Sequence, residues 1–275
     1  MLTIQGKSVD CQETGSGPAV LFIPGSFSTP AAWRPIQSLL PEKYHQIGTS
    51  LCGYGATEET RTADDFGMTH EVGVVAAVAR HVGRPLHLVG HSFGGTVAFA
   101  AALAGVAEVL SIAVFEANPL ALARTDGDTA AYDETREMSL AFEAACHAGE
   151  PDAAGRIIDY WGGAGSFAAM PGPVQDYCRR TARANVLDWH TAFGFQAGPA
   201  DYAALAIPVL LVRGARANPV MISITGALEA SLSNVRSAVV DGANHFLISS
   251  HAKACAGLLA DFLEETDAGV CAADA

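Results

Sequence analysis

Residues 86–104 read LHLVGHSFGGTVAFAAALA, and this stretch decides the fold. The apolar run LHLV predicts a buried strand, and the run FGGTVAFAAALA predicts a helix. A strand that turns directly into a helix forces the residue at its apex, Ser92, into a strained backbone conformation. Such a sharp turn is possible because Gly90 and Gly94, two residues before and two after the apex, carry no side chains.

The apex of this turn holds the Ser92 hydroxyl clear of the strand, at the start of a helix. Free N–H groups and the positive end of the helix dipole favour negative charge that develops there. We therefore predict that Ser92 is a nucleophile. A nucleotide-binding turn is the structural alternative, but the chain lacks G-x-G-x-x-G here and the acidic residue that such a site needs about 20 residues later.

Short strands and helices alternate on both sides of this stretch. Five of the expected strands are short apolar runs that do not alternate, which is typical of a parallel sheet covered by helices on both faces, and a weaker strand is expected at 44–49. The alternation predicts an α/β fold with right-handed crossovers. The expected strands are 19–23, 44–49, 86–89, 109–115, 208–212 and 235–240, and the expected helices are 30–40, 67–82, 93–104, 220–232 and 252–264.

The alternation stops in residues 117–205, where helical patterns follow one another without a strand. We interpret residues 117–205 as a helical cap inserted into an α/β core made of residues 1–116 and 206–265. Residues 2–13 predict a hairpin at one edge of the sheet. Residues 266–275 have few apolar side chains and are expected to form a flexible tail.

The sequence Gly90-His91-Ser92-Phe93-Gly94-Gly95 resembles the nucleophile elbow of the α/β-hydrolase superfamily, in its capped, esterase-like branch. The resemblance covers most of the chain. It implies a mostly parallel eight-stranded sheet flanked by helices, a helical cap over the active site, and a nucleophile, an acid and a histidine in that order. Haloalkane dehalogenases and epoxide hydrolases of this fold use an aspartate nucleophile, so Ser92 argues against both activities.

Members of the superfamily usually carry His-Gly after the third strand, and the backbone amide that follows faces the oxyanion. This chain reads Ile23-Pro24-Gly25-Ser26-Phe27, so the glycine matches and Pro24 replaces the histidine. Because the contact is made by an amide, the proline removes no catalytic donor. We assign the oxyanion hole to the N–H groups of Ser26 and Phe93, with the Ser26 hydroxyl as a candidate third donor.

The expected strand 235–240 ends in Asp241-Gly242-Ala243-Asn244-His245, which resembles the Gly-x-x-His signature of the family. An imidazole titrates near operating pH, so it can take the serine proton and return it to a leaving group. His245 is therefore the predicted base. His91 adjoins Ser92, but neighbours on a tight turn point in different directions, and we expect His91 to pack behind the elbow.

The usual acid of the family follows the strand at 208–212, but here the turn reads Gly214-Ala215-Arg216-Ala217-Asn218 and has no carboxylate. Part of the superfamily places the acid after the preceding strand, where this chain has Glu116. A carboxylate after an apolar strand is partly buried and needs a partner, for which His245 is the candidate. We predict Glu116 as the third triad member. The alternatives are a Glu116 paired with a cap residue, and Asn218 as a neutral orienting group.

These residues predict hydrolysis of a carboxylic ester, lactone or thioester through an acyl-Ser92 intermediate. Two other functions stay open. Carbon–carbon bond hydrolysis or a lyase reaction is suggested by a loose likeness of the loop PGSFSTPAAW at 24–33, and ligand binding without catalysis is suggested by the missing aspartate and by Pro24. Four aromatic residues are candidates for the wall of a substrate pocket: Phe27, Trp161, Phe167 and Trp189.

The bulk composition narrows the range of partners. The 275 residues are 50% apolar and 16% charged, with a formal net charge of −13. This charge, without any Lys/Arg cluster, argues against nucleic acid and anionic lipid surfaces as partners. Residues 1–6 lack the pattern of a secretory signal and no run reaches about 18 apolar residues, so we expect a cytoplasmic location. No motif requires a metal or another cofactor. We expect a small-molecule substrate and a monomer or homodimer.

Overall fold

A single mixed sheet organises the computed structural model, which describes residues 1–4, 6–124 and 129–273. Its seven strands lie in the order β3-β5-β4-β6-β7-β8-β9, and all neighbours are parallel except β3 and β5. The predicted α/β sheet is confirmed, with seven strands rather than eight. The strands are β3 (Gln12–Thr14), β5 (His45–Gly48), β4 (Ala19–Ile23), β6 (Leu86–His91), β7 (Val109–Phe115), β8 (Val209–Gly214) and β9 (Val235–Val240).

The N-terminal hairpin differs from the prediction. The strands β1 (Leu2–Ile4) and β2 (Lys7–Val9) pair with each other in a separate two-stranded sheet, and β3 takes the edge of the main sheet. The chain leaves the hairpin at Asp10, whose N–H donates to Thr57 Oγ1 (3.0 Å) and whose carbonyl accepts from Thr49 Oγ1 (2.8 Å). These loop contacts replace the ladder hydrogen bonds that a continuous edge strand would need.

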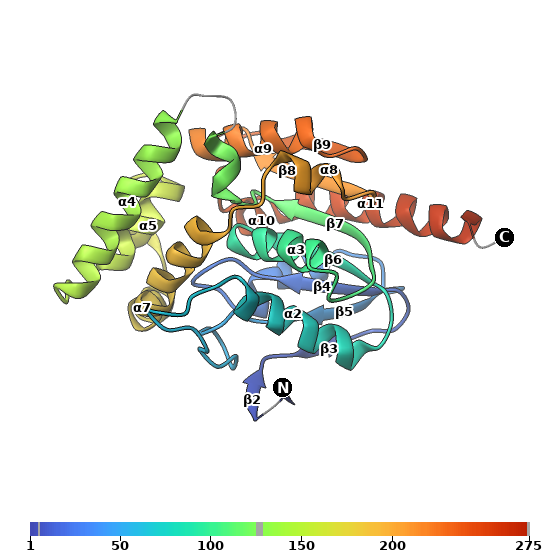
Figure 1. Cartoon of the computed structure of the whole chain (residues 1–275), viewed down its shortest axis with the longest axis horizontal. Helices are drawn as coiled ribbons and strands as arrows, with labels where there is room; N and C mark the ends of the chain where they lie inside the picture. The colour runs from blue at the N-terminus through green and yellow to red at the C-terminus, as the bar shows by residue number, and fades with distance from the viewer. Residues whose placement is uncertain (5, 125–128, 274–275) are drawn as a thin grey trace.

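Helices cover both faces of the sheet (Figure 1). Successive residues of β4 point to opposite faces, so Leu21 and Ile23 pack into one core cluster and Val20 and Phe22 into the other. The first face carries α2 (Thr69–Val82), α3 (Phe93–Leu103) and α9 (Pro219–Ser231), and the second carries η1 (Pro30–Trp33), α1 (Arg34–Gln37), α10 (Leu247–Ser250) and α11 (Ala252–Ala273).

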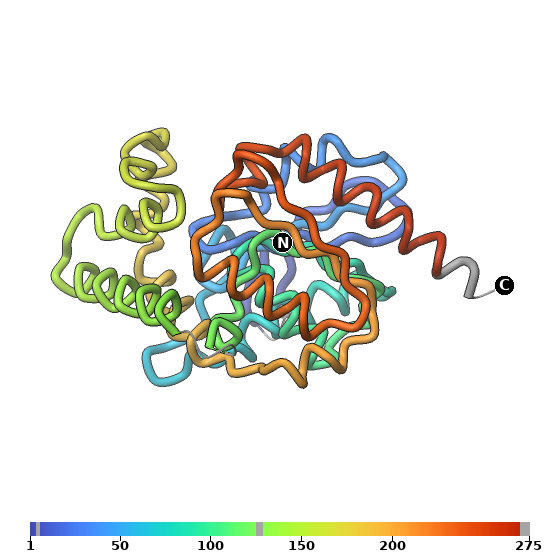
Figure 2. The backbone as a smooth tube through the Cα atoms, turned by 90° about the horizontal axis from the view of Figure 1, so that it is seen from above, coloured from blue at the N-terminus to red at the C-terminus, as the bar shows by residue number. Residues whose placement is uncertain are grey.

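Only helices are found in the described chain between β7 and β8. Figures 1 and 2 show α4, α5 and α7 projecting to one side of the sheet. The long helix α7 returns the chain toward the core. None of the helices in the described ranges is both long and apolar enough to span a bilayer. The inserted elements are η2 (Leu120–Arg124), α4 (Ala130–His147), α5 (Ala153–Gly162), α6 (Ser166–Ala169), α7 (Gly172–Gly194) and α8 (Pro199–Ala203).

The C-terminal segment is helical where a flexible tail was expected. Helix α11 continues to Ala273, and residues 274–275 lie outside the described chain. Thr266 is buried, and Asp267 accepts hydrogen bonds from Tyr44 (3.1 Å) and His87 (3.1 Å). The apolar pattern of the sequence could not predict this part of the helix, because polar hydrogen bonds attach it to the core.

Candidate active site

Ser92 lies at the turn between β6 and α3 with φ 52° and ψ −127°. Its N–H donates to the carbonyl of Phe115 on the neighbouring strand (3.0 Å), which holds the turn against β7. The turn leaves no room for a side chain at position 90 or at position 94. A Cβ at Gly90 would lie 2.5 Å from Gly95 Cα, and a Cβ at Gly94 would lie 2.3 Å from the carbonyl oxygen of Pro24.

His245 follows β9, and its Nε2 lies 3.0 Å from Ser92 Oγ. Its Nδ1 lies 2.7 Å from Glu116 Oε2, and the other oxygen of Glu116 accepts the Gly214 N–H at 2.8 Å. A carboxylate only accepts, so Nδ1 carries the proton and Nε2 faces Ser92 as an acceptor. The structure thus brings the three predicted residues together in one hydrogen-bonded chain.

Glu116 sits directly after β7 with φ 50° and is almost fully buried. Burial alone would raise the pKa of this carboxyl, but the hydrogen bond from His245 and the amide of Gly214 outweigh it and hold the pKa below its usual value. Glu116 is therefore a carboxylate at neutral pH. It contacts His245 rather than a cap residue.

Asn218 has a structural position instead of the orienting one that was its alternative role. It is the N-cap of α9, where its Oδ1 accepts the Val220 N–H at 3.1 Å. The same oxygen lies 3.4 Å from the hydroxyl of Tyr160. The Nδ1 of His245 is occupied by Glu116, so Asn218 is not needed to orient it.

The imidazole of His245 is stacked on Trp161 and lies tilted against His91. Trp161 lies 4.8 Å away at 29°, and His91 lies 4.9 Å away at 38°. His91 Nε2 also donates to the carbonyl of His245 (2.9 Å). Burial, and then the charge of His245, lower the pKa of His91 to about 3, so His91 is neutral. The residue that we expected to pack behind the elbow packs on His245 itself.

The predicted oxyanion donors, Ser26 and Phe93, both lie close to Ser92. Ser26 is in the turn after β4, where a Cβ on its neighbour Gly25 would come within 3.0 Å of Ser92 Cβ. Phe93 is the first residue of α3, where backbone N–H groups lack partners within the helix. Neither amide donates to another described residue. Phe27 follows with φ 59°, in the left-handed region.

The Ser26 hydroxyl is not a free donor, and the expectation of a third oxyanion donor is wrong. It donates to Asp188 Oδ2 at 2.5 Å. Asp188 lies on α7 and also accepts from Tyr54 (2.6 Å) and from Arg61 (2.8 Å). A hydroxyl has one proton, and the Ser26 hydroxyl donates that proton in its hydrogen bond to Asp188.

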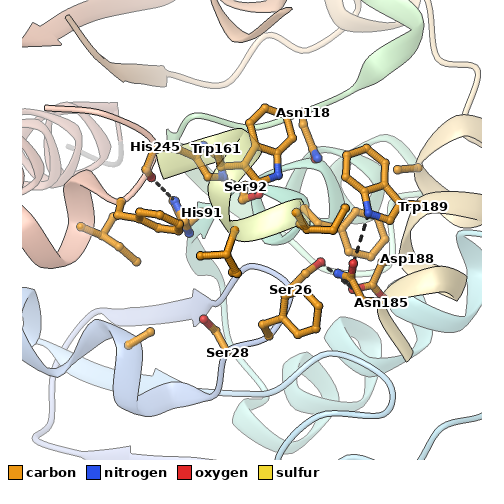
Figure 3. Close-up of a pocket in the computed structure, with 18 of the residues that line it drawn as sticks. Ser26, Ser28, His91, Ser92, Asn118, Trp161, Asn185, Asp188, Trp189 and His245 are labelled. Atoms are coloured by element: carbon orange, nitrogen blue, oxygen red, sulfur yellow. Dashed lines mark hydrogen bonds between the residues drawn. The ribbon is translucent and has the colours of Figure 1, made fainter. Parts of the chain in front are cut away.

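A cavity of about 120 Å³ opens over Ser92 (Figure 3). Trp161 on α5 and Trp189 on α7 form parallel walls, with ring centroids 6.1 Å apart at 7°. Three of the four aromatics predicted to line the pocket do so: Phe27, Trp161 and Trp189. The fourth, Phe167, is not among the lining residues; it packs under Arg179, whose guanidinium lies 5.5 Å from the ring centroid.

The buried carboxylate of Asp188 is the pocket residue that sequence reasoning missed. Its partners Ser26, Tyr54 and Arg61 are 127 to 162 residues away in the chain. One signal was available, because Asp188 follows Asn185 by three residues and precedes Ala192 by four, and so shares the buried face of a helix. Asn185 also lines the cavity, and its Oδ1 accepts the indole N–H of Trp189 at 3.1 Å.

Potential metal ligands gather elsewhere in the described chain. A thiol, a carboxylate and an imidazole come within 4.8 Å of one another at Cys11, Glu13 and His81. His81 Nε2 is hydrogen-bonded to Glu13 at 2.7 Å, which accounts for their proximity without an ion. None of the three lines the cavity over Ser92.

Comparison with known proteins places this geometry in a family. The model of the alpha/beta hydrolase family matches residues 20–258. The chain is 27% identical over 261 residues to 2-(acetamidomethylene)succinate hydrolase of Mesorhizobium japonicum, covering 87% of this chain and 86% of that protein. It is 30% identical over 124 residues to a fluoroacetate dehalogenase of Burkholderia sp, covering 43% of this chain and 40% of that relative.

Solved structures show the same fold. A bacterial membrane phospholipase A superposes with a TM-score of 0.78 at 20% identity, covering 97% of this chain and 85% of that one. At this identity the likeness concerns the fold alone. The matched range includes Ser26, Ser92, Glu116 and His245. The chain belongs to the alpha/beta hydrolase family.

Proposed function

We propose that this protein is a serine hydrolase that cleaves a carboxylic ester, or a related acyl compound such as a lactone or thioester, through an acyl-Ser92 intermediate. One observation carries the proposal: Ser92, His245 and Glu116 form a continuous hydrogen-bonded chain with contacts of 3.0 and 2.7 Å. The relative that matches most of the chain is named as a hydrolase, which supports hydrolysis as the reaction type.

In the first half-reaction, Ser92 Oγ attacks the acyl carbon while His245 Nε2 takes the hydroxyl proton. Glu116 stabilises the imidazolium through Nδ1, and the amides of Ser26 and Phe93 donate to the oxyanion. One such donor is worth about 3 kcal/mol of transition-state stabilisation. The imidazolium then gives its proton to the leaving alcohol. Water attacks the acyl-enzyme with His245 again as the base, which releases the acid and restores Ser92.

The test combines a covalent probe with a chromogenic substrate. We expect a fluorophosphonate probe to label the wild-type protein and not Ser92→Ala. We expect short-chain 4-nitrophenyl esters to be hydrolysed with an initial burst when acylation is faster than deacylation. Mass spectrometry of the labelled protein would place the adduct on Ser92.

The matched control is Ser26→Ala, which retains the nucleophile and the backbone amide of residue 26 and should still be labelled. A folded wild-type protein that is neither labelled nor active would overturn the proposal and favour ligand binding without catalysis. Labelling of Ser92 without turnover of any ester, lactone or thioester would instead favour carbon–carbon bond cleavage by the same three residues.

A further inference from the structure

The cavity over Ser92 has two chemically different ends. In the proposed reaction His245 protonates the leaving oxygen, so the leaving alcohol must lie at the His245 end. The acyl group then extends toward the opposite end, where Figure 3 shows Trp189, Asn185 and Asp188. The residues at this end lie on α7 and in the turn after β4 that contains Ser26.

The lining of the cavity carries no fixed positive charge. Among the described residues that line it there is no lysine and no arginine, and the one carboxylate is Asp188. His91 is neutral at the pH of an assay because its pKa lies at about 3. Positive potential comes from the start of α3, which faces Ser92, and so acts on the oxyanion rather than at the acyl end.

Asp188 forms an ion pair with Arg61, whose Nη1 lies 2.8 Å from Oδ1. Arg61 is not among the residues that line the cavity, and it is shared with two other carboxyl groups, Glu59 at 2.8 Å and Glu71 at 3.1 Å. Three carboxyl groups thus face one guanidinium, and Glu71 is mostly charged only above pH 7, because burial raises its pKa to about 7. We name these four residues, Glu59, Arg61, Glu71 and Asp188, the acidic cluster.

Asp188 accepts hydrogen bonds from Ser26, Tyr54 and Arg61, which is the geometry of a carboxylate. Burial is the largest effect on its pKa and raises it above the usual value, although Arg61 and the hydroxyls of Ser26 and Tyr54 favour the charged form. Tyr54 remains a donor because burial and the neighbouring Asp188 raise its own pKa. An anionic group placed in this cavity would meet the carboxylate of Asp188, with no lysine or arginine among the lining residues to compensate it.

We propose that the acyl end of this cavity accepts uncharged acyl groups and rejects those that carry a carboxylate, and that Asp188 determines this selectivity. The proposal rests on the proposed function, because it assumes an acyl-Ser92 intermediate. It adds a class of substrate, namely uncharged and largely apolar acyl esters. The walls agree with this class, since Trp161, Trp189 and Ile157 are apolar.

Three methyl esters of matched size test the selectivity. Methyl 4-methylpentanoate ends in an isopropyl group, methyl succinamate in an uncharged amide, and monomethyl succinate in a carboxylate of nearly the same shape. Acid release is followed in a pH-stat at pH 8, with about 0.5 M salt to screen the long-range charge of the protein. We expect kcat/KM for the succinamate to exceed that for the succinate by roughly 100-fold, the effect of two like charges about 6 Å apart at an effective dielectric constant of about 20.

Two variants assign the effect to a residue. Asp188→Asn removes the carboxylate from the cavity and should reduce the ratio of succinamate to succinate kcat/KM by about tenfold or more. Glu71→Gln is the matched control, because it removes one carboxylate from the same acidic cluster without touching the cavity. Its ratio should change by less than about threefold.

The outcomes separate this inference from the function on which it rests. If the fluorophosphonate probe labels Ser92 and wild-type protein hydrolyses succinate and succinamate esters within threefold of each other, the inference is wrong and the function stands. If selectivity is present but Glu71→Gln and Asp188→Asn reduce it equally, Asp188 is not its determinant. The wild-type comparison decides the selectivity even when Asp188→Asn fails to fold. Absence of labelling and of turnover overturns both proposals.

Discussion

The two oxygens of Glu116 have different partners, and this makes a conservative substitution severe. Oε1 accepts the Gly214 N–H and Oε2 accepts from His245 Nδ1. In Glu116→Gln the amide oxygen would stay on Gly214, so the NH₂ group would face Nδ1 and force the proton onto Nε2. His245 could then no longer take the Ser92 proton. We expect kcat to fall by about 10³- to 10⁴-fold, measured with 4-nitrophenyl esters.

Asn218→Ala is the control for this prediction. It removes the N-cap contact to Val220 and should lower the free energy of unfolding by about 1 kcal/mol while kcat changes little. The reverse pattern, with a severe loss of kcat in Asn218→Ala and a mild one in Glu116→Gln, would show that Glu116 is not the acid.

Glu71 gives a pH dependence to stability. It is fully buried, and burial is the main reason that its pKa rises from 4.5 to about 7. The folded protein therefore binds more protons than the unfolded chain between these two pH values, so this residue lowers the free energy of unfolding as pH rises from about 4.5 to about 7. Above the higher value its effect is constant.

Glu71→Gln should remove this dependence. The amide oxygen of the variant can still accept the Cys52 N–H, and Arg61 keeps Glu59 and Asp188 as partners. We expect the stability of the variant relative to wild type to increase across that pH window, as measured by urea unfolding at several pH values. A difference that is flat with pH would mean that Glu71 has an ordinary pKa.

At the scale of elements, the turn that carries Ser92 is limited by backbone contacts. A Cβ at Gly94 would lie 2.3 Å from the Pro24 carbonyl oxygen, and neither chain segment can yield without moving a strand or a helix. We expect Gly94→Ala to lower the free energy of unfolding by at least ~2 kcal/mol and to abolish labelling of Ser92.

The matched control is Gly226→Ala in α9, where an added Cβ meets nothing within 4 Å and the position is exposed. Alanine has the higher helix propensity, so this variant should gain about 0.5–1 kcal/mol. Thermal unfolding of the two variants checks that Gly94→Ala lowers the stability and that Gly226→Ala raises it. Equal effects would show that steric contact at Gly94 is unimportant.

At the scale of the whole molecule, α11 joins the end of the chain to the sheet. Phe262 and Leu263 are buried in the second core cluster, and Asp267 is bonded to Tyr44 and His87. A chain that stops after Ala260 loses all of these contacts. At about 1.5–3 kcal/mol for each buried apolar side chain, we expect it to lose most of its stability in urea unfolding.

A chain that stops after Asp267 is the control, because it keeps every one of those contacts. Its urea midpoint should lie close to that of the full chain. A large loss in this longer truncation would mean that the remaining turns of α11, rather than the contacts named above, stabilise the fold.

Local patterns predicted most of this molecule. Apolar runs marked five of the seven strands of the main sheet, a weaker pattern marked β5, and the glycines around Ser92 marked the turn at the nucleophile. The sequence order of the resembling family then suggested His245 and Glu116, although their contact joins residues 129 positions apart. The short strand β3 was not predicted as a strand of the main sheet, because its three residues are all exposed and show no apolar pattern.

The acidic cluster could not be predicted, for a physical reason. A buried carboxylate is tolerable only with its partners, and the partners of Asp188 come from distant loops that the fold alone brings to it. Its neighbours in the chain say nothing about Arg61 or Tyr54. The Ser26 hydroxyl was misassigned for the same reason, because its acceptor lies on another element.

Phe27, Ser92 and Glu116 are the non-glycine residues with positive φ in the described chain, and all three surround the reacting centre. Such a conformation costs about 1–3 kcal/mol at each position, and glycine would relieve it. A laboratory selection for heat tolerance alone would therefore favour glycine at Ser92 and Glu116, whereas at Phe27 the loss of a buried ring would cost more than the strain. It would erase the nucleophile and the acid as it did so. Any effort to evolve a hardier form of this protein must select for turnover at the same time.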